Sequence, residues 1–147
     1  MSVDIIPAAP DDAPVLAAIL IDWADKTPWM PDVYPRAETE ALFDHMIATR
    51  AVWVARRDGL TLGFVAVDRG GYVDALYLRD GARGQGLGAR LLDRAKADAP
   101  GILALRAFRQ ATGARRFYAR AGFSEVEGSE GAENDAGLPD IRLEWRG

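Results

Sequence analysis

The segment 83–88 combines a basic side chain, Arg83, with three glycines at alternate positions, Gly84, Gly86 and Gly88. Glycine has no Cβ atom, so a glycine-rich backbone can approach a bulky anion closely. An apolar strand pattern precedes the segment and a helical pattern follows it. The unpaired N–H groups and the positive dipole end of such a helix would face the same anion. We therefore predict that this strand–loop–helix binds phosphate groups.

The glycine run alone leaves the class of phosphate ligand open. Gly84-x-Gly86-x-x-Ala89 satisfies the dinucleotide-binding fingerprint. The context does not, because too little chain follows for the remaining parallel units and no acid lies about twenty residues further on. A triphosphate-binding loop is excluded since no Gly-Lys-Ser/Thr follows, whereas a purely structural turn stays open. Gly88 would fall in the first helical turn, where glycine is worse than alanine by about 1 kcal/mol, so something other than helix stability favours it.

Metal and thiol chemistry are not indicated. The chain contains no cysteine, which excludes disulfides, thiolate metal sites and a cysteine nucleophile. His45 is the single histidine and falls between apolar positions of an expected helix, with no second ligand at metal-binding spacing. We therefore expect His45 to be structural or solvated, and we expect no metal site.

The 147 residues are enough for one domain with one sizeable core, so we expect a single domain over 1–147. Hydrophobic residues make up 49% and charged residues 27%, which is typical of an ordered globular protein. The net charge of −4 argues against nonspecific nucleic-acid binding. Residues 1–22 lack the pattern of a signal peptide, and no stretch approaches the length of a membrane span. A cytoplasmic location is the default expectation.

The spacing of apolar residues and the positions of turn residues predict an α/β (α+β) fold. Asp58-Gly59 is a strong hairpin signal between two apolar runs. Residues 72–108 read as a strand–helix–strand unit, whose strands should be parallel and whose crossover should be right-handed. The chain ends in an alternating strand pair. The expected strands are 2–6, 51–55, 60–67, 72–78, 102–108, 123–127 and 140–145, and the expected helices are about 11–23, 36–49, from the glycine loop to about 98, and 114–121.

Two signatures in register resemble the GCN5-related N-acetyltransferases (GNAT). Arg83-Gly84-Gln85-Gly86-Leu87-Gly88 matches the family's Gln/Arg-x-x-Gly-x-Gly/Ala pattern, and the segment 117–123, with its aromatic-Tyr and Gly-Phe pairs, matches a second signature. The order of elements is similar over nearly the whole chain. The resemblance implies a mixed, mostly antiparallel central sheet of about seven strands with helices on both faces. It also implies transfer of an acetyl group from acetyl-CoA to an amine.

In that family, acetyl-CoA lies between two splayed strands, which here end at Leu78 and Phe108. The resemblance implies that the loop 83–88 holds the diphosphate and that the pantetheine arm pairs with exposed backbone like an extra strand. The backbone N–H of Leu78 would polarise the thioester carbonyl. The cofactor contacts expected from the resemblance are Leu76, Tyr77, Leu78, Arg83, Gly84, Gln85, Gly86, Leu87, Gly88, Ala89, Ala111 and Tyr118.

The resemblance also suggests two catalytic side chains. Tyr118 matches the position beside the CoA sulfur, and a phenol with a pKa of about 10 can give a proton to a thiolate whose acid has a pKa of about 8.5. An ordinary core aromatic is the alternative. Asp74 is the candidate general base for the amine, since alternation places it on the strand face of Leu76 and Leu78. A solvated or strand-pairing aspartate is equally open.

One position departs from the family pattern. Relatives commonly carry Asn three residues before the Ala that opens the second signature, where this chain has Ala111. The amide of the neighbouring Gln110 would be turned by about 100° on a helix. We therefore expect weaker acetyl-CoA binding than in relatives with Asn. A catalytically inactive acyl-CoA-binding regulatory domain remains the alternative function.

The acceptor is less visible in the sequence. Aromatic and apolar residues held among prolines, and polar residues in the acidic loop near the C-terminus, fall where this fold usually forms its acceptor wall. Packing over the core and a merely solvated acidic loop are the alternatives. We expect an amine acceptor, a small molecule or a peptide, with neither nucleic acid nor membrane as partner, and a homodimer stays open. The residues proposed for the acceptor pocket are Trp29, Met30, Tyr34, Glu127 and Asn134.

Overall fold

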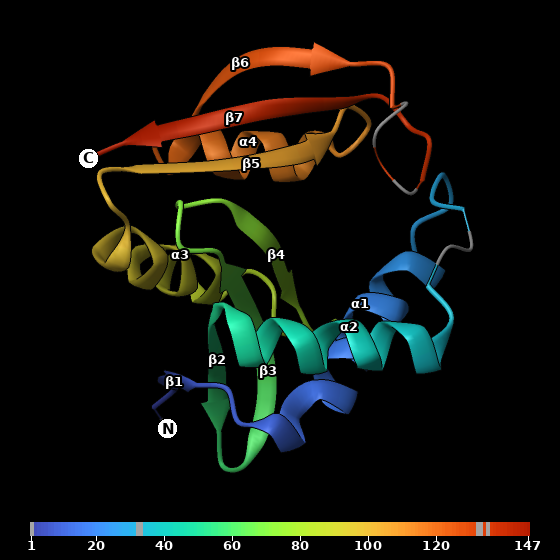
Figure 1. The fold of residues 1–147 in the computed structure, drawn as a ribbon, viewed down its shortest axis with the longest axis vertical. Helices are drawn as coiled ribbons and strands as arrows, with labels where there is room; N and C mark the ends of the chain where they lie inside the picture. Colours follow the sequence, from blue (N-terminus) through green and yellow to red (C-terminus); the bar gives the residue numbers. More distant parts are fainter. Residues whose placement is uncertain (1, 32–33, 132–133, 135) are drawn as a thin grey trace.

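The computed structural model describes residues 2–31, 34–131, 134 and 136–147. Two groups of strands lie one above the other in Figure 1, with helices packed against both. None of the helices in the described ranges is long and apolar enough to cross a lipid bilayer. In chain order the elements are β1 (Asp4–Pro7), η1 (Pro10–Asp12), α1 (Ala13–Asp25), α2 (Arg36–Thr49), β2 (Ala51–Arg57), β3 (Leu60–Val67), β4 (Val73–Leu78), α3 (Leu87–Asp98), β5 (Ile102–Phe108), α4 (Thr112–Arg120), β6 (Ser124–Ser129) and β7 (Asp140–Arg146).

The strands form two antiparallel sheets, ordered β1-β2-β3-β4 and β5-β7-β6. Within the described ranges, β4 and β5 are joined by one parallel bridge, Tyr72 with Ala104, at the start of both strands. Ala104 N–H donates to the Gly71 carbonyl oxygen beside that bridge, at 2.9 Å. Beyond it the two strands do not pair. The expected parallel strand–helix–strand unit is therefore present, and its strands separate toward Leu78 and Phe108.

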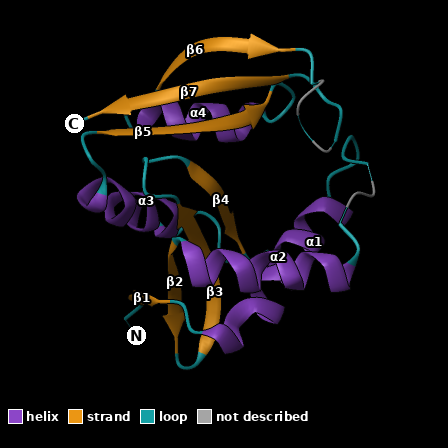
Figure 2. Ribbon diagram, in the orientation of Figure 1, coloured by secondary structure: helices purple, strands orange, loops and turns teal. Residues whose placement is uncertain are grey.

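Helices cover both faces, as the resemblance implied (Figure 2). On one face, α1 and α2 pack on the four-stranded sheet through a core that includes Leu16, Phe43 and Phe64. On the other face, α3 and α4 share one core with both sheets. Its members include Leu91 and Leu92 of α3, Leu105 of β5, Tyr118 of α4 and Leu143 of β7. This second core fixes α3 and α4 relative to the separated strands.

The element boundaries differ from the sequence predictions mainly at their ends. Residues 10–12 form a 3-10 turn, so α1 begins at Ala13 and not at about 11. The predicted hairpin at Asp58-Gly59 is confirmed, because both residues have positive φ, 52° and 79°, as a tight type I′ turn requires. His45 lies on an exposed face of α2, in agreement with a solvated role.

Candidate functional site

The glycine loop is anchored at both ends and exposed between them. Ala82 and Leu87 are buried and pack together with Leu62 of β3, whereas residues 83–86 are exposed. At its start, Arg79 N–H donates to the Leu62 carbonyl oxygen at 2.7 Å. The loop is therefore held on the hairpin β2–β3 and presents its backbone outward.

Two of the three predicted glycines are required by the backbone. Gly84 and Gly86 have φ values of 78° and 77°, which residues with a side chain rarely adopt. A Cβ atom at either position would meet no atom within 4 Å, so the space in front of the loop is open. Gly86 is the N-cap of α3 and offers no capping side chain, and the first turn of α3 contains no acid. The positive end of the helix is thus left uncompensated, as an anion site needs.

Basic side chains flank this open space. The Arg83 side chain is exposed and makes no hydrogen bond or ion pair within the described part of the chain. Gln85 is fixed by its Nε2 donating to the Gly81 carbonyl oxygen at 3.2 Å, and its Oε1 accepts from Arg57 at 3.4 Å. Of the predicted loop residues, Arg83 is therefore the one whose charge is available to a ligand.

The end of β4 presents unpaired backbone to β5. Arg79 and Leu62 are hydrogen-bonded across β4 and β3, and Leu78 lies opposite Gly63, one position along. Antiparallel pairs alternate between bonded and non-bonded, so Leu78 and, two residues earlier, Leu76 turn their N–H groups away from β3. They face β5, with which they form no pair. This geometry is what the expected pairing of a pantetheine arm requires.

Gly63 allows β3 to pass close beneath Leu78. A Cβ atom at Gly63 would clash with Leu78 Cδ2 and lie 2.8 Å from the Tyr77 carbonyl oxygen. The close approach holds the Leu78 backbone against β3. It leaves the opposite edge of β4 free.

Tyr118 is the buried side chain of α4 and belongs to the core between α3, α4 and the sheets. Its ring lies 5.2 Å from that of Phe117 and 5.6 Å from that of Phe123. Leu76 and Leu78 pack against the same core. Burial raises the pKa of the Tyr118 hydroxyl well above its usual value, so the phenol keeps its proton at neutral pH. Core packing and a proton-donating role are both compatible with this position.

Asp74 lies at an irregularity in the pairing of β4 with β3. A β-bulge interrupts the pairing of β3 with β4, since Ala66 pairs with Ala75 but Val67 pairs with Val73. Val73 consequently joins the core against which Leu76 and Leu78 pack. Simple alternation along β4 therefore does not continue through the bulge, and the placement of Asp74 on the face of Leu76 and Leu78 stays a prediction.

The Asp74 carboxylate is instead bound to the residue between α2 and β2. Arg50 Nε donates to Asp74 Oδ2 at 2.6 Å. Burial raises the pKa of Asp74 above its usual value, and the hydrogen bond from Arg50 opposes that rise. Asp74 therefore forms an ion pair with Arg50, and its side chain is half-buried.

A continuous aromatic wall spans the separated strands on the side of α1. The rings of Trp23 and Tyr77 lie 5.2 Å apart, and those of Trp23 and Trp29 lie 6.1 Å apart. Trp29 also contacts Phe108 at the end of β5, with 5.6 Å between ring centroids. Trp29 therefore connects Trp23 of α1 to the end of β5. Met30 is buried and so serves packing.

Two members of this wall, Trp23 and Phe108, are not among the five residues that the sequence analysis proposed for the acceptor pocket. Trp23 follows Leu16, Ile19 and Leu20 on one face of α1, a spacing that could have revealed it. Phe108 had no comparable signal, because only the fold brings the end of β5 to Trp29.

Tyr77 lies near Tyr34 and Tyr118, and its burial raises its pKa above the usual value for tyrosine.

The described part of the acidic loop contains a network of paired side chains, whereas Glu130 is exposed, and Glu133 and Asp135 lie outside the described residues. Glu127 accepts a hydrogen bond from Arg106 at 3.3 Å, and Asn134 donates to Asp140 Oδ2 at 3.1 Å. Asp140, which sequence reasoning missed, is buried and also accepts from Arg106 at 3.1 Å and Ser129 at 2.6 Å. Glu127 of β6 and Asn134 are therefore hydrogen-bonded within this part of the chain, and their contact with an acceptor stays a prediction.

Ala111 is the N-cap of α4 and provides no side-chain cap. Its N–H donates to the Phe108 carbonyl oxygen at 2.9 Å, and its carbonyl oxygen accepts from Arg115 N–H at 3.0 Å. Asn is a preferred residue at this helical position. The departure from the family pattern therefore removes a helix cap as well as an amide.

Comparisons with known proteins agree with this geometry. Residues 28–145 match the family model for the acetyltransferase (GNAT) domain. The peptidyl-lysine N-acetyltransferase YjaB of Salmonella typhimurium is 36% identical over 105 residues, which cover 71% of this chain and 70% of the relative. The peptidyl-lysine N-acetyltransferase YiaC of Escherichia coli is 27% identical over 134 residues, covering 88% and 90%.

Solved structures show the same fold. The apo form of YjaB from Escherichia coli superposes with a TM-score of 0.80 at 27% identity, over 99% of this chain and 98% of the other. The acetyltransferase yncA of Salmonella typhimurium, solved with acetyl-CoA, superposes with a TM-score of 0.77 at 16% identity, over 99% and 94%. At that identity the second likeness supports the fold alone.

Proposed function

Because the chain belongs to the GNAT family of acetyltransferases, we propose that it transfers the acetyl group of acetyl-CoA to the ε-amine of a lysine in a peptide or protein. Family membership confirms the predicted fold and the prediction of an acetyl-CoA-dependent N-acetyltransferase. The transfer to lysine by direct attack in a ternary complex is the part that we propose.

The observation that carries the proposal is the unpaired edge of β4 between the glycine loop and Tyr118. The unpaired N–H groups of Leu76 and Leu78 come just before the glycine loop in the sequence. That loop leads into α3, whose N-terminus has no side-chain cap. Acetyl-CoA supplies an activated thioester. Residues 83–88 would hold its diphosphate, and the edge of β4 would hold its pantetheine arm.

Three groups of this chain would carry the transfer. The Leu78 N–H would donate to the carbonyl oxygen while the amine nitrogen bonds to the carbonyl carbon and the carbon–sulfur bond breaks. The Tyr118 hydroxyl would give its proton to the departing sulfur. The Asp74 carboxylate would take the proton that the amine loses, directly or through water.

The aromatic wall supports a lysine acceptor. The rings of Tyr77, Trp23, Trp29 and Phe108 contact one another successively, in that order, from β4 to β5. Such rings suit the aliphatic stem and the cationic end of a lysine. The names of the two curated relatives point to the same class of acceptor.

The alternative is an acyl-CoA-binding regulatory domain without turnover, which the missing amide at Ala111 favours. The two functions are separated by incubating the protein with acetyl-CoA and an N-terminally blocked lysine peptide, and measuring release of free CoA. The matched control peptide carries norleucine in place of lysine. Release with lysine alone supports the proposal. Acetyl-CoA binding without release on any amine would favour the regulatory domain.

A further inference from the structure

Asp140, at the start of β7, is the one buried charged side chain among the described residues. Aspartate is almost never fully buried in a protein unless its charge is paired. A buried ion pair is also a poor source of stability, because removing two charges from water costs about as much free energy as their attraction returns. The burial of Asp140 therefore favours a role in fixing the geometry of its neighbours.

The Asp140 carboxylate joins three segments of the chain. Its Oδ1 accepts from Arg106 of β5 at 3.1 Å and from Ser129 of β6 at 2.6 Å. Its Oδ2 accepts from the Asn134 amide at 3.1 Å. Leu138 fixes the orientation of that amide, because its carbonyl oxygen accepts from Asn134 Nδ2 at 2.7 Å and its N–H donates to Asn134 Oδ1 at 3.2 Å. Both oxygens of Asp140 are thus bonded to donors that are themselves held in place.

This network surrounds the end of β5, where Phe108 lies. Asp140 is the partner of Phe108 in the pairing of β5 with β7. Arg106 comes two residues before Phe108 and so projects from the same face of β5. Immediately after Phe108, the Arg109 N–H donates to the Pro139 carbonyl oxygen at 2.9 Å. The chain on both sides of Phe108 is therefore tied to Asp140 or to the residue before it.

Phe108 carries this constraint to the aromatic wall. Its ring centroid lies 5.6 Å from that of Trp29. Trp29 belongs to the segment between α1 and α2, which occupies the same end of the molecule as the start of β7 (Figure 1). A displacement of the end of β5 would therefore change the spacing of the last two rings of the wall.

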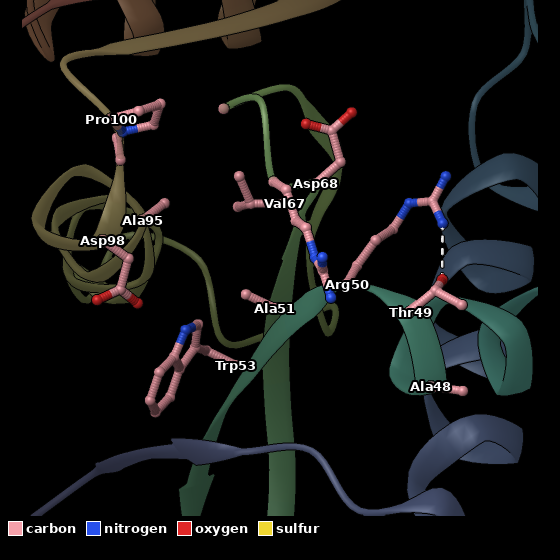
Figure 3. A pocket seen from close by; sticks show the side chains of 13 residues that line it. Ala48, Thr49, Arg50, Ala51, Trp53, Val67, Asp68, Ala95, Asp98 and Pro100 are labelled. Carbon is pink, nitrogen blue, oxygen red and sulfur yellow. Dashed lines mark hydrogen bonds between the residues drawn. The ribbon is translucent and has the colours of Figure 1, made fainter.

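A cavity of about 390 Å³ beside Arg50 and Asp68 is separate from the wall (Figure 3). Its lining comes from α2, β2, β3, α3 and the segments that follow β3 and α3. Among the described residues that line it, none belongs to the aromatic wall. We therefore expect the fit of an acceptor against the wall to depend on the end of β5 and not on this cavity.

We propose that Asp140 is a positioning residue for the acceptor, which acts through Arg106 and Phe108 and does not touch the reacting atoms. It holds Phe108 beside Trp29, so that the two rings accommodate the aliphatic stem of the lysine. This inference rests on the proposed acetylation of lysine. Asp140→Asn tests it, because the substitution keeps the size of the side chain but places an NH₂ group opposite a donor, either Arg106 or Asn134. The bond from Arg106 also loses its charged acceptor.

The first test needs no turnover and follows the indole N–H resonance of Trp29 by nuclear magnetic resonance in the full chain. Trp29→Phe identifies the signal. Asp140→Asn and Arg106→Gln should each move it, because Phe108 is no longer held beside the Trp29 ring. The matched control is Asp12→Asn, which removes a partly buried ion pair with Arg56 at 2.6 Å, outside the wall, and should leave the signal in place. A Trp29 signal that does not move in the first two variants, or that moves equally in the control, overturns the proposal.

The second test is kinetic. Asp140→Asn should raise the KM for the lysine peptide about tenfold and leave kcat and the Kd for acetyl-CoA within about twofold of the wild type. Phe108→Leu should also raise this KM, and adding Asp140→Asn to it should cause no further rise, since both changes act through one ring. A lower kcat at unchanged KM, or additive effects of the two changes, would contradict the positioning role. If the wild type released no CoA with the lysine peptide, the proposed function would fail, and the Trp29 signal would still decide the role of Asp140.

Discussion

A Cβ atom at Gly88 would lie 3.3 Å from Cζ of Phe117. The two residues belong to the two separate signatures, one at the start of α3 and the other in α4. The same Cβ position lies 3.8 Å from Leu78 Cδ1 at the end of β4. Glycine therefore stands in the first turn of α3, at a helix-propensity cost of about 1 kcal/mol, because the Phe117 ring of α4 leaves little room for a side chain there. The contact joins the expected diphosphate loop to the helix that carries Tyr118.

Gly86 should be essential for acetyl-CoA binding. Gly86→Ala places a side chain at a φ of 77°, a conformation that costs about 1–2 kcal/mol, and the loop is expected to relax away from the anion-binding geometry. We predict an acetyl-CoA Kd about tenfold higher by calorimetry. The control is Gly101→Ala, which imposes comparable strain at a φ of 109° and likewise meets no neighbour within 4 Å. Equal effects of the two variants on affinity would refute a specific role for Gly86.

Ala111→Asn should restore both a helix cap and the missing amide. An Asn at an N-cap stabilises a helix by about 1 kcal/mol relative to Ala, so the free energy of unfolding should rise by that amount. The acetyl-CoA affinity should also rise. Ala111→Asp separates the two effects, because it caps the helix equally well but brings a negative charge toward the phosphates. If Ala111→Asn raised stability and not affinity, the amide contact would be dispensable here.

Tyr118→Phe should slow turnover without changing cofactor affinity. We predict a fall in kcat on the order of a hundredfold, typical for loss of a general acid, with an unchanged Kd for acetyl-CoA. Because burial raises the pKa of Tyr118, the wild-type rate should not decline as the pH rises through about 10, where an exposed tyrosine ionises. Unaltered kcat in Tyr118→Phe would identify the residue as an ordinary core aromatic.

On the acidic side, the pH dependence of the acetylation rate should follow the ionisation of Asp74. A general base must be deprotonated, so activity rises as pH increases through its pKa. Arg50 lowers that pKa and Asp68 raises it, so Arg50→Gln should move the limb to higher pH and Asp68→Asn to lower pH. Asp74→Asn should reduce kcat about a hundredfold. The acceptor amine is common to all variants, and an identical limb in all of them would exclude Asp74 as the base.

Trp29 should govern the acceptor and not the cofactor. Trp29→Ala removes the ring that joins Trp23 to Phe108 across the two sheets. We predict a KM for the lysine peptide about tenfold higher, and an unchanged Kd for acetyl-CoA. Trp145→Ala, which removes a partly buried ring packed beside Gly122 and Lys96, is the control for loss of a large aromatic. A KM shift of equal size in the control would remove the special role of Trp29.

Much of the fold was predictable because its signals are local. The helix 36–49 and the strands 60–67 and 102–108 have the predicted bounds, since their apolar periods end at clear turn residues. The bulge at Asp74 has no local signal, because it arises from the pairing of β4 with β3. The contact of Trp29 with Phe108 and the buried network around Asp140 likewise depend on segments far apart in the sequence.

The central claim is that acetyl-CoA occupies the edge of β4 that faces β5, and a crystal structure of the CoA complex tests it most directly. We predict the diphosphate on the backbone of residues 83–88, the pantetheine arm hydrogen-bonded to the backbone of Leu76 and Leu78, and the sulfur beside the Tyr118 hydroxyl. A CoA molecule bound elsewhere, or one whose pantetheine arm makes no backbone hydrogen bond to β4, would contradict the account.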